Sequence, residues 1–333
     1  MCIRDRYNEA NSSPLENGEA TAMIQPLVVE KLKDQSVVID FGYYELGVVT
    51  CYGKGKGELQ IIVGQSIEEV MEEDQECLEQ RQMRAEPVNE YGRQYSSTKQ
   101  AIRYARIIIK GDVDLSDYTF EAKVWPVSYE GKFDSSDQEL NDCWYAGAAT
   151  IHSCMHEFYL DAIYRDGLPW ALDGLCAMEA AGYIFDDEQL AHQHICSQML
   201  AEDSDVSDLG VVYLDFQLHT ILGIEYNYLL RKDKDFLLSH KQVIDHTLTT
   251  YMALQNASGF ISALGFKGAH FFPDWSVDAV IGPDCYGTPS YVQMMLTHCL
   301  EFGAFTAKLS GDPQLADMYL KKANHLRDEV RRH

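Results

Sequence analysis

Short runs of β-branched and aromatic residues, separated by glycines, fill the chain from about residue 28 to residue 127. Such runs predict β-strands, because branched side chains pack well on a pleated surface. The predicted strands are residues 37–41, 47–52, 58–63, 104–109 and 121–127, and the lysine- and glycine-rich run 53–57 is predicted to be a hairpin turn. The acidic run 68–82 is predicted to be a solvated loop or a short helix. Many short strands with glycine turns are typical of a sandwich.

After residue 133 the apolar positions change to helical spacing. Asp137, followed by Glu139, predicts the first helix N-terminus, and the helix continues to about residue 155. Further helices are predicted over residues 169–185, 187–200, 214–231, 235–255, 288–310 and from 313 to the end, with no strand between them. We therefore expect an all-α second domain built from helical hairpins.

These patterns predict three segments. Residues 1–27 remain unassigned, and residues 1–6 are interpreted as translated sequencing-adapter sequence, because they match neither a helix nor a strand and contain no apolar core of a signal peptide. A β-sandwich domain is expected over residues 28–130. A helical domain is expected over residues 131–333.

Composition narrows the class of protein. Of the 333 residues 46% are hydrophobic and 24% charged, as in globular proteins, and the net charge is -25. That charge repels phosphate backbones, and no run of eighteen apolar residues occurs, so we expect neither a nucleic-acid partner nor a membrane span. A neutral carbohydrate is compatible with the charge. The nine cysteines form no CxxC pair, which favours buried free thiols and a reducing compartment.

The densest group of chemically active side chains lies in residues 161–173, where Asp161, Arg165, Asp166, Trp170 and Asp173 occur together. A proline at position 169 fits the first turn of a helix, so Asp161 and Asp166 are expected on a loop and Asp173 on the first helical turns. Carboxylates at this place also stabilise a helix N-terminus without any catalytic role, and that alternative stays open.

The composition of this cluster favours chemistry on a sugar. Neighbouring carboxylates shift one another's pKa values, so that one can act as a general acid while another stays ionised. A tryptophan beside them offers the apolar wall on which a sugar ring stacks. The cluster therefore indicates the cleavage of glycosidic bonds.

A second candidate region is the loop around residues 271–275, where Asp274 and Trp275 follow two phenylalanines. Exposed aromatic side chains on a connecting loop fit a binding rim. The alternative, in which Trp275 folds back over the helical core, stays open. His152 and His156 are spaced as metal ligands on a helix, but no third ligand is evident, so we expect no metal and no cofactor.

Residues 161–173 resemble, without a gap, the DCPxRERLGWxGD signature of bacterial α-L-rhamnosidases of glycoside hydrolase family 78, and still more a DGIxRDRLPWxGD version of it. The residues around Asp40 and Gly64, the run 103–106 and the loop 272–275 resemble the surroundings of that signature, so the similarity extends from about residue 30 to the end. It implies a jelly-roll-like β-sandwich followed by an (α/α)6 toroid, in a bacterial protein of the cytoplasm or periplasm.

The resemblance also implies roles for individual residues. Asp166 takes the place of the proton-donating glutamate, Asp161 and Asp173 match acids that hold sugar hydroxyls, and Arg165 matches the arginine beside the donor. Trp170 and Trp275 match aromatic walls, and Asp274 precedes the second of them in the same loop. The implied reaction is inverting hydrolysis of a terminal α-L-rhamnoside.

Three of the positions at which this sequence departs from the DCPxRERLGWxGD signature bear on the implied site. Asp166 is one methylene shorter than glutamate, Gly167 replaces an arginine, and Leu172 replaces a glycine. The helices predicted here are fewer than a complete toroid contains, so we expect a truncated fragment whose general base lies beyond His333 and whose toroid is incomplete. Two alternatives remain: a toroid glycosidase for another sugar, and a carbohydrate-binding protein without catalysis.

Overall fold

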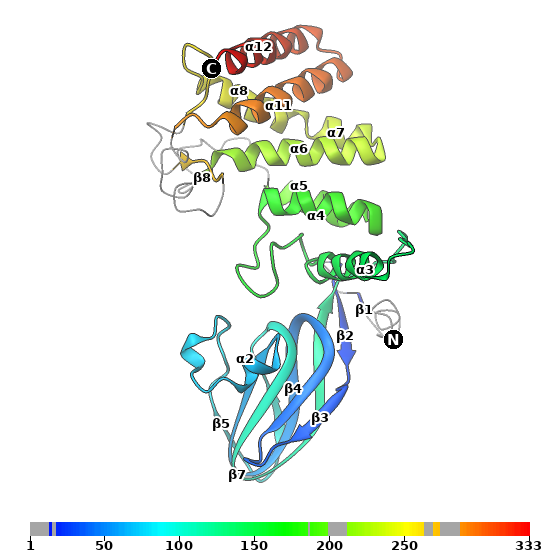
Figure 1. Cartoon of the computed structure of the whole chain (residues 1–333), viewed down its shortest axis with the longest axis vertical. Helices are drawn as coiled ribbons and strands as arrows, with labels where there is room; N and C mark the ends of the chain where they lie inside the picture. The colour runs from blue at the N-terminus through cyan, green and yellow to red at the C-terminus, as the bar shows by residue number, and fades with distance from the viewer. Residues whose placement is uncertain (1–12, 15–17, 186, 199–211, 263–268, 274–286) are drawn as a thin grey trace. The chain divides into compact units, whose positions relative to one another are not determined.

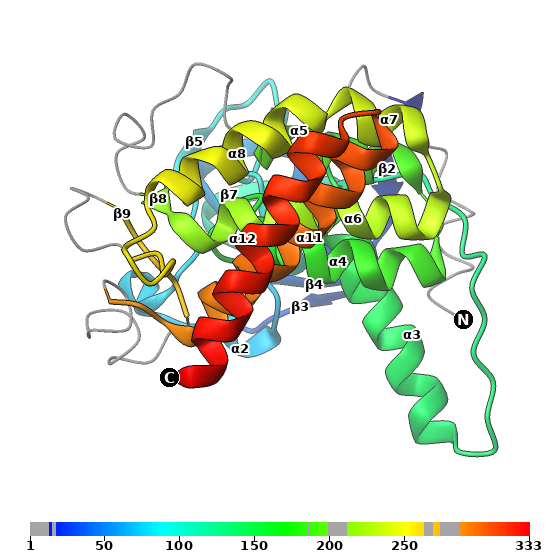
Figure 2. The same ribbon diagram turned by 90° about the horizontal axis from the view of Figure 1, so that it is seen from above.

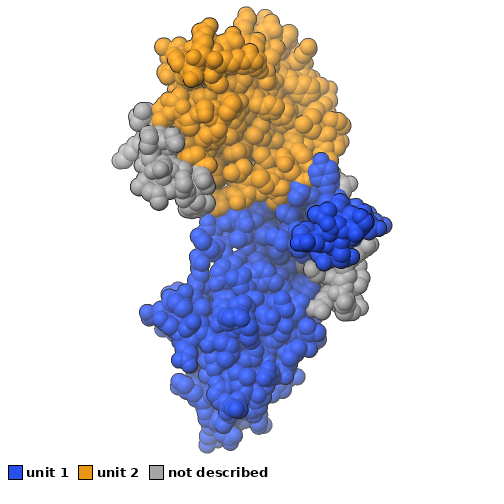
Figure 3. All heavy atoms as spheres, viewed as in Figure 1, with its two compact units in different colours: residues 1–168, 180–190 blue, residues 169–179, 191–333 orange. Residues whose placement is uncertain are grey.

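The computed structural model describes residues 13–14, 18–185, 187–198, 212–262, 269–273 and 287–333. The chain forms two compact units, coloured separately in Figure 3. Unit 1 comprises Met1–Leu168 and Ala180–Leu190, and unit 2 comprises Pro169–Glu179 and Ala191–His333. Unit 1 contains the β-sheet, and unit 2 contains most of the helices (Figure 1).

Unit 1 is built on a curled antiparallel sheet dominated by two long strands, β4 (Val37–Gly64) and β7 (Gln100–Val124). The shorter strands are β1 (Ser13–Pro14), β2 (Ala20–Ile24), β3 (Val28–Lys31), β5 (Glu86–Val88) and β6 (Arg93–Ser96). The order is β1-β2-β7-β4-β3, and β5 and β6 also pair with β4. The prediction of a β-rich first part is confirmed, although β2 had not been predicted.

The two long strands meet twice. Residues 104–107 of β7 pair with residues 37–40 of β4 on one edge, and with residues 61–64 of the same strand on the other. This arrangement needs β4 to bend back around β7, and the register shifts between Asp40 and Glu45 and around Gly47 mark where it bends. Buried side chains from both strands fill the curl, with the rings of Phe41 and Phe120 5.3 Å apart.

The hairpin turn predicted over residues 53–57 is wrong, because these residues continue β4 and pair with residues 111–115 of β7. Glycine is needed here for close backbone approach: a Cβ atom would lie 2.1 Å from the Asp112 carbonyl oxygen at Gly55, and 2.0 Å from that of Lys110 at Gly57. The acidic run contains the predicted short helices, α2 (Ile67–Met71) and the 3₁₀ turn η1 (Gln75–Cys77).

The helical part begins as predicted at α3, whose N-terminus is capped by the Asp137 carboxylate. The helices are α3 (Gln138–Ser153), α4 (Ala171–Ile184), α5 (Glu188–Gln198), α6 (Leu214–Arg231), α7 (Lys234–Ser239), α8 (Lys241–Ala253), α11 (Ser290–Leu309) and α12 (Pro313–Arg332). In unit 2, α11 and α12 lie side by side as a hairpin (Figures 1 and 2), and α11 also contacts α6 and α8. Helical hairpins are thus present, as expected.

Two predictions for the helical part are wrong. The single helix expected over residues 235–255 is interrupted at His240, whose Nδ1 lies 2.7 Å from the Phe236 carbonyl oxygen and which ends α7 and begins α8. Two short strands, β8 (Val212–Tyr213) and β9 (Ala269–His270), pair in parallel where no strand had been expected. The parallel pair forms between segments far apart in the chain, which a local pattern does not reveal.

The expectation of buried cysteines is also wrong for most of those described. Cys51 and Cys299 are buried, but Cys77, Cys143, Cys176 and Cys196 are exposed. Helical spacing placed the last three correctly on helices, and they lie on the outer faces of these helices. No described helix combines the length and the apolar character needed to cross a membrane.

Candidate active site

The acidic loop of the signature is closed by two reciprocal hydrogen bonds between Asp161 and Leu168. The Leu168 N–H donates to the Asp161 carboxylate at 2.9 Å, and the Asp161 N–H donates to the Leu168 carbonyl oxygen at 3.1 Å. Because Leu168 precedes helix α4, this carboxylate closes the loop and does not cap the helix. The alternative in which Asp161 serves as a cap of the following helix is therefore wrong.

Asp166 lies at the tip of this closed loop and is exposed. Its φ is +34°, and that of the following Gly167 is +65°. Two consecutive residues in the left-handed region make a tight reversal, which glycine adopts at little cost and aspartate more readily than most residues. Gly167, which replaces an arginine of the signature, thus occupies a position where its lack of a side chain relieves backbone strain.

The β domain braces the loop through Tyr164. Its hydroxyl donates to the Glu69 carboxylate at 2.7 Å, and burial, followed by this hydrogen bond, raises the pKa of Tyr164 to about 12. Glu69 is presented by α2, where Ser66 caps the helix and the Gln65 N–H donates to Glu69 at 2.7 Å. The hydroxyl therefore stays protonated at neutral pH and remains a donor.

Arg165 makes an ion pair with a second residue of the acidic run. Its Nε lies 3.1 Å from an Oε of Glu79, and both side chains are more than half exposed. Such surface pairs contribute little to stability, so Arg165 can exchange this partner for a ligand at small cost.

The remaining described residues of the signature belong to unit 2. Helix α4 begins at Ala171, two residues later than predicted, and the Trp170 carbonyl accepts the Gly174 N–H at 2.9 Å. Asp173 is exposed in the first turn, as expected, where a carboxylate also interacts favourably with the helix dipole. Trp170 is half-buried, with Tyr213 and Phe216 each at 5.7 Å between ring centroids.

The buried carboxylate of Asp215 holds residues next to the aromatic cluster of Trp170, Tyr213 and Phe216 in place. Asp215 is fully buried, and its oxygens accept the Phe272 N–H at 3.0 and 3.1 Å and the Tyr291 hydroxyl at 2.6 Å. Phe272 in turn lies 5.1 Å from the ring of Tyr213. Through these bonds Asp215 holds the strand-to-loop segment at Phe272 and the first turn of α11 in place.

The second predicted region is only partly described. Phe271 is fully buried, so the expectation that both phenylalanines form an exposed rim is wrong for it. The hydrophobic effect favours its packing in the helical core over exposure on a loop. Asp274 and Trp275 lie outside the described residues.

Sequence reasoning missed three groups that shape these regions: Glu69, Glu79 and Asp215. The first two lie in an acidic run typical of a solvated surface, and Asp215 lies in a first helical turn, where acids are common for electrostatic reasons alone. A signal existed for Glu69, since Ser66 lies three residues before it, which is the spacing of a capping box. The Ser66 hydroxyl does accept the Glu69 N–H, but the Glu69 carboxylate accepts the N–H of Gln65 and not that of Ser66.

His152 and His156, weighed as metal ligands, are bonded to protein groups at every ring nitrogen. His152 contacts the Tyr129 hydroxyl at 3.1 Å and the Trp125 carbonyl oxygen at 2.7 Å. His156 contacts the buried Glu19 carboxylate at 2.9 Å and the Ser153 carbonyl oxygen at 3.0 Å. His152, in the last turn of α3, and His156, just beyond the end of α3, therefore tie this segment to other parts of unit 1.

Comparison with solved structures identifies the class of fold. The chain is similar to a GH78 family rhamnosidase of Bacillus sp. GL1 (17% identity, TM-score 0.71), with 97% of this chain and 33% of that chain covered. It is similar to a rhamnosidase from Klebsiella oxytoca with rhamnose bound (15% identity, TM-score 0.72), with 98% of this chain and 72% of that chain covered. It is also similar to an α-L-rhamnosidase from Aspergillus terreus (13% identity, TM-score 0.70), with 96% of this chain and 39% of that chain covered.

These likenesses confirm the predicted fold class, a β domain followed by a toroid-like helical domain. The chain spans about a third of the length of the Bacillus rhamnosidase. No family model matches the sequence, and no curated protein matches it.

Proposed function

We propose that this chain belongs to a glycoside hydrolase that releases a terminal α-L-rhamnosyl residue with inversion of configuration. The observation that carries the proposal is the closed loop of residues 161–168, which presents the exposed Asp166 at its tip. The fold shared with rhamnosidases, one of them holding rhamnose, supports a carbohydrate substrate.

In this proposal Asp166 protonates the glycosidic oxygen of the leaving group, while a water attacks the anomeric carbon from the opposite face. Inverting enzymes separate the acid and the base by roughly 6.5–9.5 Å, which leaves room for that water. The acid gives its proton to the leaving oxygen, and a base takes one from the water. No base is assigned among the described residues.

The other residues bind and orient the sugar. Asp161 keeps one oxygen on the Leu168 N–H, and its remaining lone pairs are available for a sugar hydroxyl. Arg165, Asp173 and Asp274 supply further polar contacts, and Trp170 and Trp275 supply apolar walls. No metal and no cofactor takes part in this mechanism.

The test is hydrolysis of a panel of aryl glycosides by this chain and by a longer protein containing it. Release of the aryl group from the α-L-rhamnoside, with β-L-rhamnose as the first product by NMR, supports the proposal. Asp166→Asn should lower kcat by about 10²–10⁴-fold. Unchanged turnover by that variant would remove the assignment of Asp166.

Two alternatives are separated by the same panel. Turnover of another glycoside and not of the rhamnoside would identify a toroid glycosidase for a different sugar, because a fold does not fix the substrate. Binding of sugars without turnover of any member, in the longer protein as well, would identify a carbohydrate-binding protein.

A further inference from the structure

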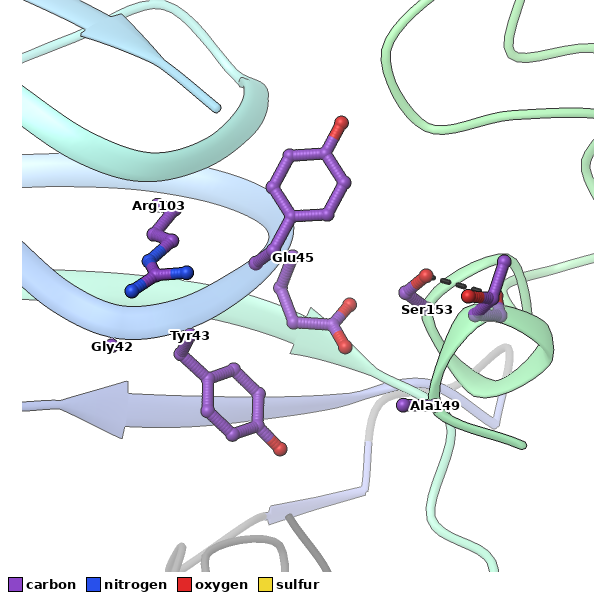
Figure 4. A pocket seen from close by; sticks show the side chains of 8 residues that line it. Gly42, Tyr43, Glu45, Arg103, Ala149 and Ser153 are labelled. Carbon is purple, nitrogen blue, oxygen red and sulfur yellow. Dashed lines mark hydrogen bonds between the residues drawn. The ribbon is translucent and has the colours of Figure 1, made fainter. Parts of the chain in front are cut away.

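A pocket in unit 1, whose lining includes no residue of the acidic loop, is formed by polar and aromatic side chains of the kinds that bind sugars. It has a volume of about 220 Å³ and opens between the bend of β4 and helix α3 (Figure 4). A volume of this size holds several water molecules, each of which takes ~30 Å³ in the liquid. The lining residues are Gly42, Tyr43, Tyr44, Glu45, Arg103, Ala149, Thr150 and Ser153.

The pocket exists because β4 carries an irregularity at this point. Between Asp40 and Glu45 the strand has extra residues opposite the single Arg103 of β7. Gly42 takes a φ of +64°, and its N–H donates to the Asp40 carboxylate at 2.6 Å. The same carboxylate holds the Arg103 guanidinium at 3.3 and 3.4 Å. Bulges of this kind re-aim side chains, and here Tyr43, Tyr44 and Glu45 line the pocket.

Glu45 is the unusual member of the lining. Its side chain is only 2% exposed, and acidic residues are rarely buried so fully. Figure 4 shows its carboxylate pointing toward the side of the pocket formed by Ala149 and Ser153. An ionised carboxylate has about four acceptor sites, so it can receive ligand hydroxyls in addition to its protein contacts.

The charges of the pocket decide which ligand it suits. Glu45 offers acceptors, and Arg103 on the opposite side offers N–H donors. The Arg103 guanidinium is paired with Asp40, and the Glu45 carboxylate repels an anionic ligand. The hydroxyls of a neutral polyol can donate to Glu45 and accept from Arg103. Tyr43 and Tyr44 provide the aromatic surface on which a sugar ring packs.

The pocket also adjoins the acidic loop. Ser153 in its lining precedes Cys154, whose carbonyl oxygen accepts the Leu160 N–H at 2.9 Å, one residue before Asp161. Burial, and more weakly the charges of Glu45 and Asp161, raise the pKa of Cys154 to about 11. Cys154 therefore lies within electrostatic reach of the pocket carboxylate and of the loop carboxylate.

We propose that the pocket lined by Tyr43, Glu45, Arg103 and Ser153 is a second saccharide subsite, which binds one neutral sugar ring beside the acidic loop. Binding here needs no cleavage, so the subsite does not rest on the proposed function.

The test uses the whole chain carrying Trp170→Ala, which removes an aromatic wall proposed for the catalytic site. Saturation-transfer NMR titrations measure the binding of methyl glycosides of rhamnose, glucose and galactose. At least one should bind, and Tyr43→Ala should weaken it about tenfold through the loss of ring packing. Ala149→Leu fills the pocket without removing a polar group and should weaken it similarly. Tyr91→Ala, which removes a tyrosine 90% exposed in the same unit, should leave binding unchanged.

Four outcomes would overturn the subsite. The sugars could all fail to bind, the two pocket variants could bind like their parent, or binding could disappear with Asp166→Asn alone. Tighter binding of tetramethylammonium than of any sugar, lost with Glu45→Gln, would instead show a cation pocket. Circular dichroism of each variant checks that it folds. If the proposed function is wrong but the subsite is real, no glycoside is hydrolysed while sugar binding that depends on Tyr43 is still observed.

Discussion

The Tyr164 hydroxyl donates a 2.7 Å hydrogen bond to Glu69, which lies 95 residues earlier in the chain. One partner belongs to the acidic loop and the other to helix α2 beside the sheet. Within unit 1, the β domain therefore supports the loop that carries Asp166. The order of the two segments in the sequence gives no hint of this contact.

Removing that hydroxyl should loosen the loop. For Tyr164→Phe we expect a loss of roughly 1.5–3 kcal/mol in the local stability of the loop, because a bond to a charged acceptor is lost. Hydrogen exchange at the Leu168 amide, which is bonded to Asp161, should accelerate accordingly. Tyr91→Phe changes an exposed tyrosine and serves as the control. Equal exchange in both variants would show that the contact does not support the loop.

Gly167→Ala should act through backbone strain alone. A Cβ there would meet nothing nearer than 3.8 Å, but the φ of +65° costs an alanine about 1 kcal/mol. Gly311, with a φ of +87° and open space around it, is the matched control in unit 2. Thermal unfolding should show a similar loss of stability for both alanine variants, and only Gly167→Ala should lower kcat/KM in the longer protein that contains this chain. Equal activity of the two variants would contradict a role for the loop geometry.

Asp215→Ala should destabilise unit 2 strongly. It leaves the Phe272 N–H and the Tyr291 hydroxyl without their shared acceptor, at a cost of about 3 kcal/mol or more. Denaturant unfolding measures the loss. Asp235→Ala, at an exposed position in the first turn of α7, should change stability by less than about 0.5 kcal/mol. A small loss at Asp215 would mean that other groups hold Phe272 and Tyr291.

Acid should destabilise the fold well before the carboxylates are protonated. Burial lowers the pKa of His152, His194 and His219 to about 4, from an ordinary value of 6.5. Below pH 6.5 these histidines are protonated in the unfolded chain but stay neutral in the folded chain. The free energy of unfolding therefore falls as the pH decreases from 6.5 toward 4. Each histidine then costs on the order of 2–3 kcal/mol at pH 4.

A variant of one of these histidines tests the cause. The Nδ1 of His219 is buried without a hydrogen-bond partner in the described part of the chain. His219→Leu should therefore retain its stability at pH 7 and lose less of it on acidification, as measured by unfolding at pH 7 and pH 4.5. An unchanged loss between the two pH values would exclude His219 from the acid response.

The order of the fold could be predicted from the sequence because strand and helix patterns are local. Helix α6 begins and ends where its apolar spacing predicts, and the signature places Asp161 and Asp166 on a loop and Asp173 on a helix. The glycines of residues 53–57 led to the wrong prediction of a turn. Glycine is needed there because β7, more than fifty residues later in the chain, approaches the backbone closely. Phe271 and Asp215 likewise depend on tertiary packing that no local pattern contains. The roles assigned to the signature residues stay predictions.

The double pairing of β7 with β4 has a consequence for how the protein folds. Both edges of residues 104–107 are paired only after residues 37–40 and residues 61–64 have each folded back onto them. Such non-local pairings slow folding, whereas the α11–α12 hairpin forms from neighbours in the chain. The β domain is synthesised early yet should acquire its structure late, and until then its long apolar strands are exposed to aggregation.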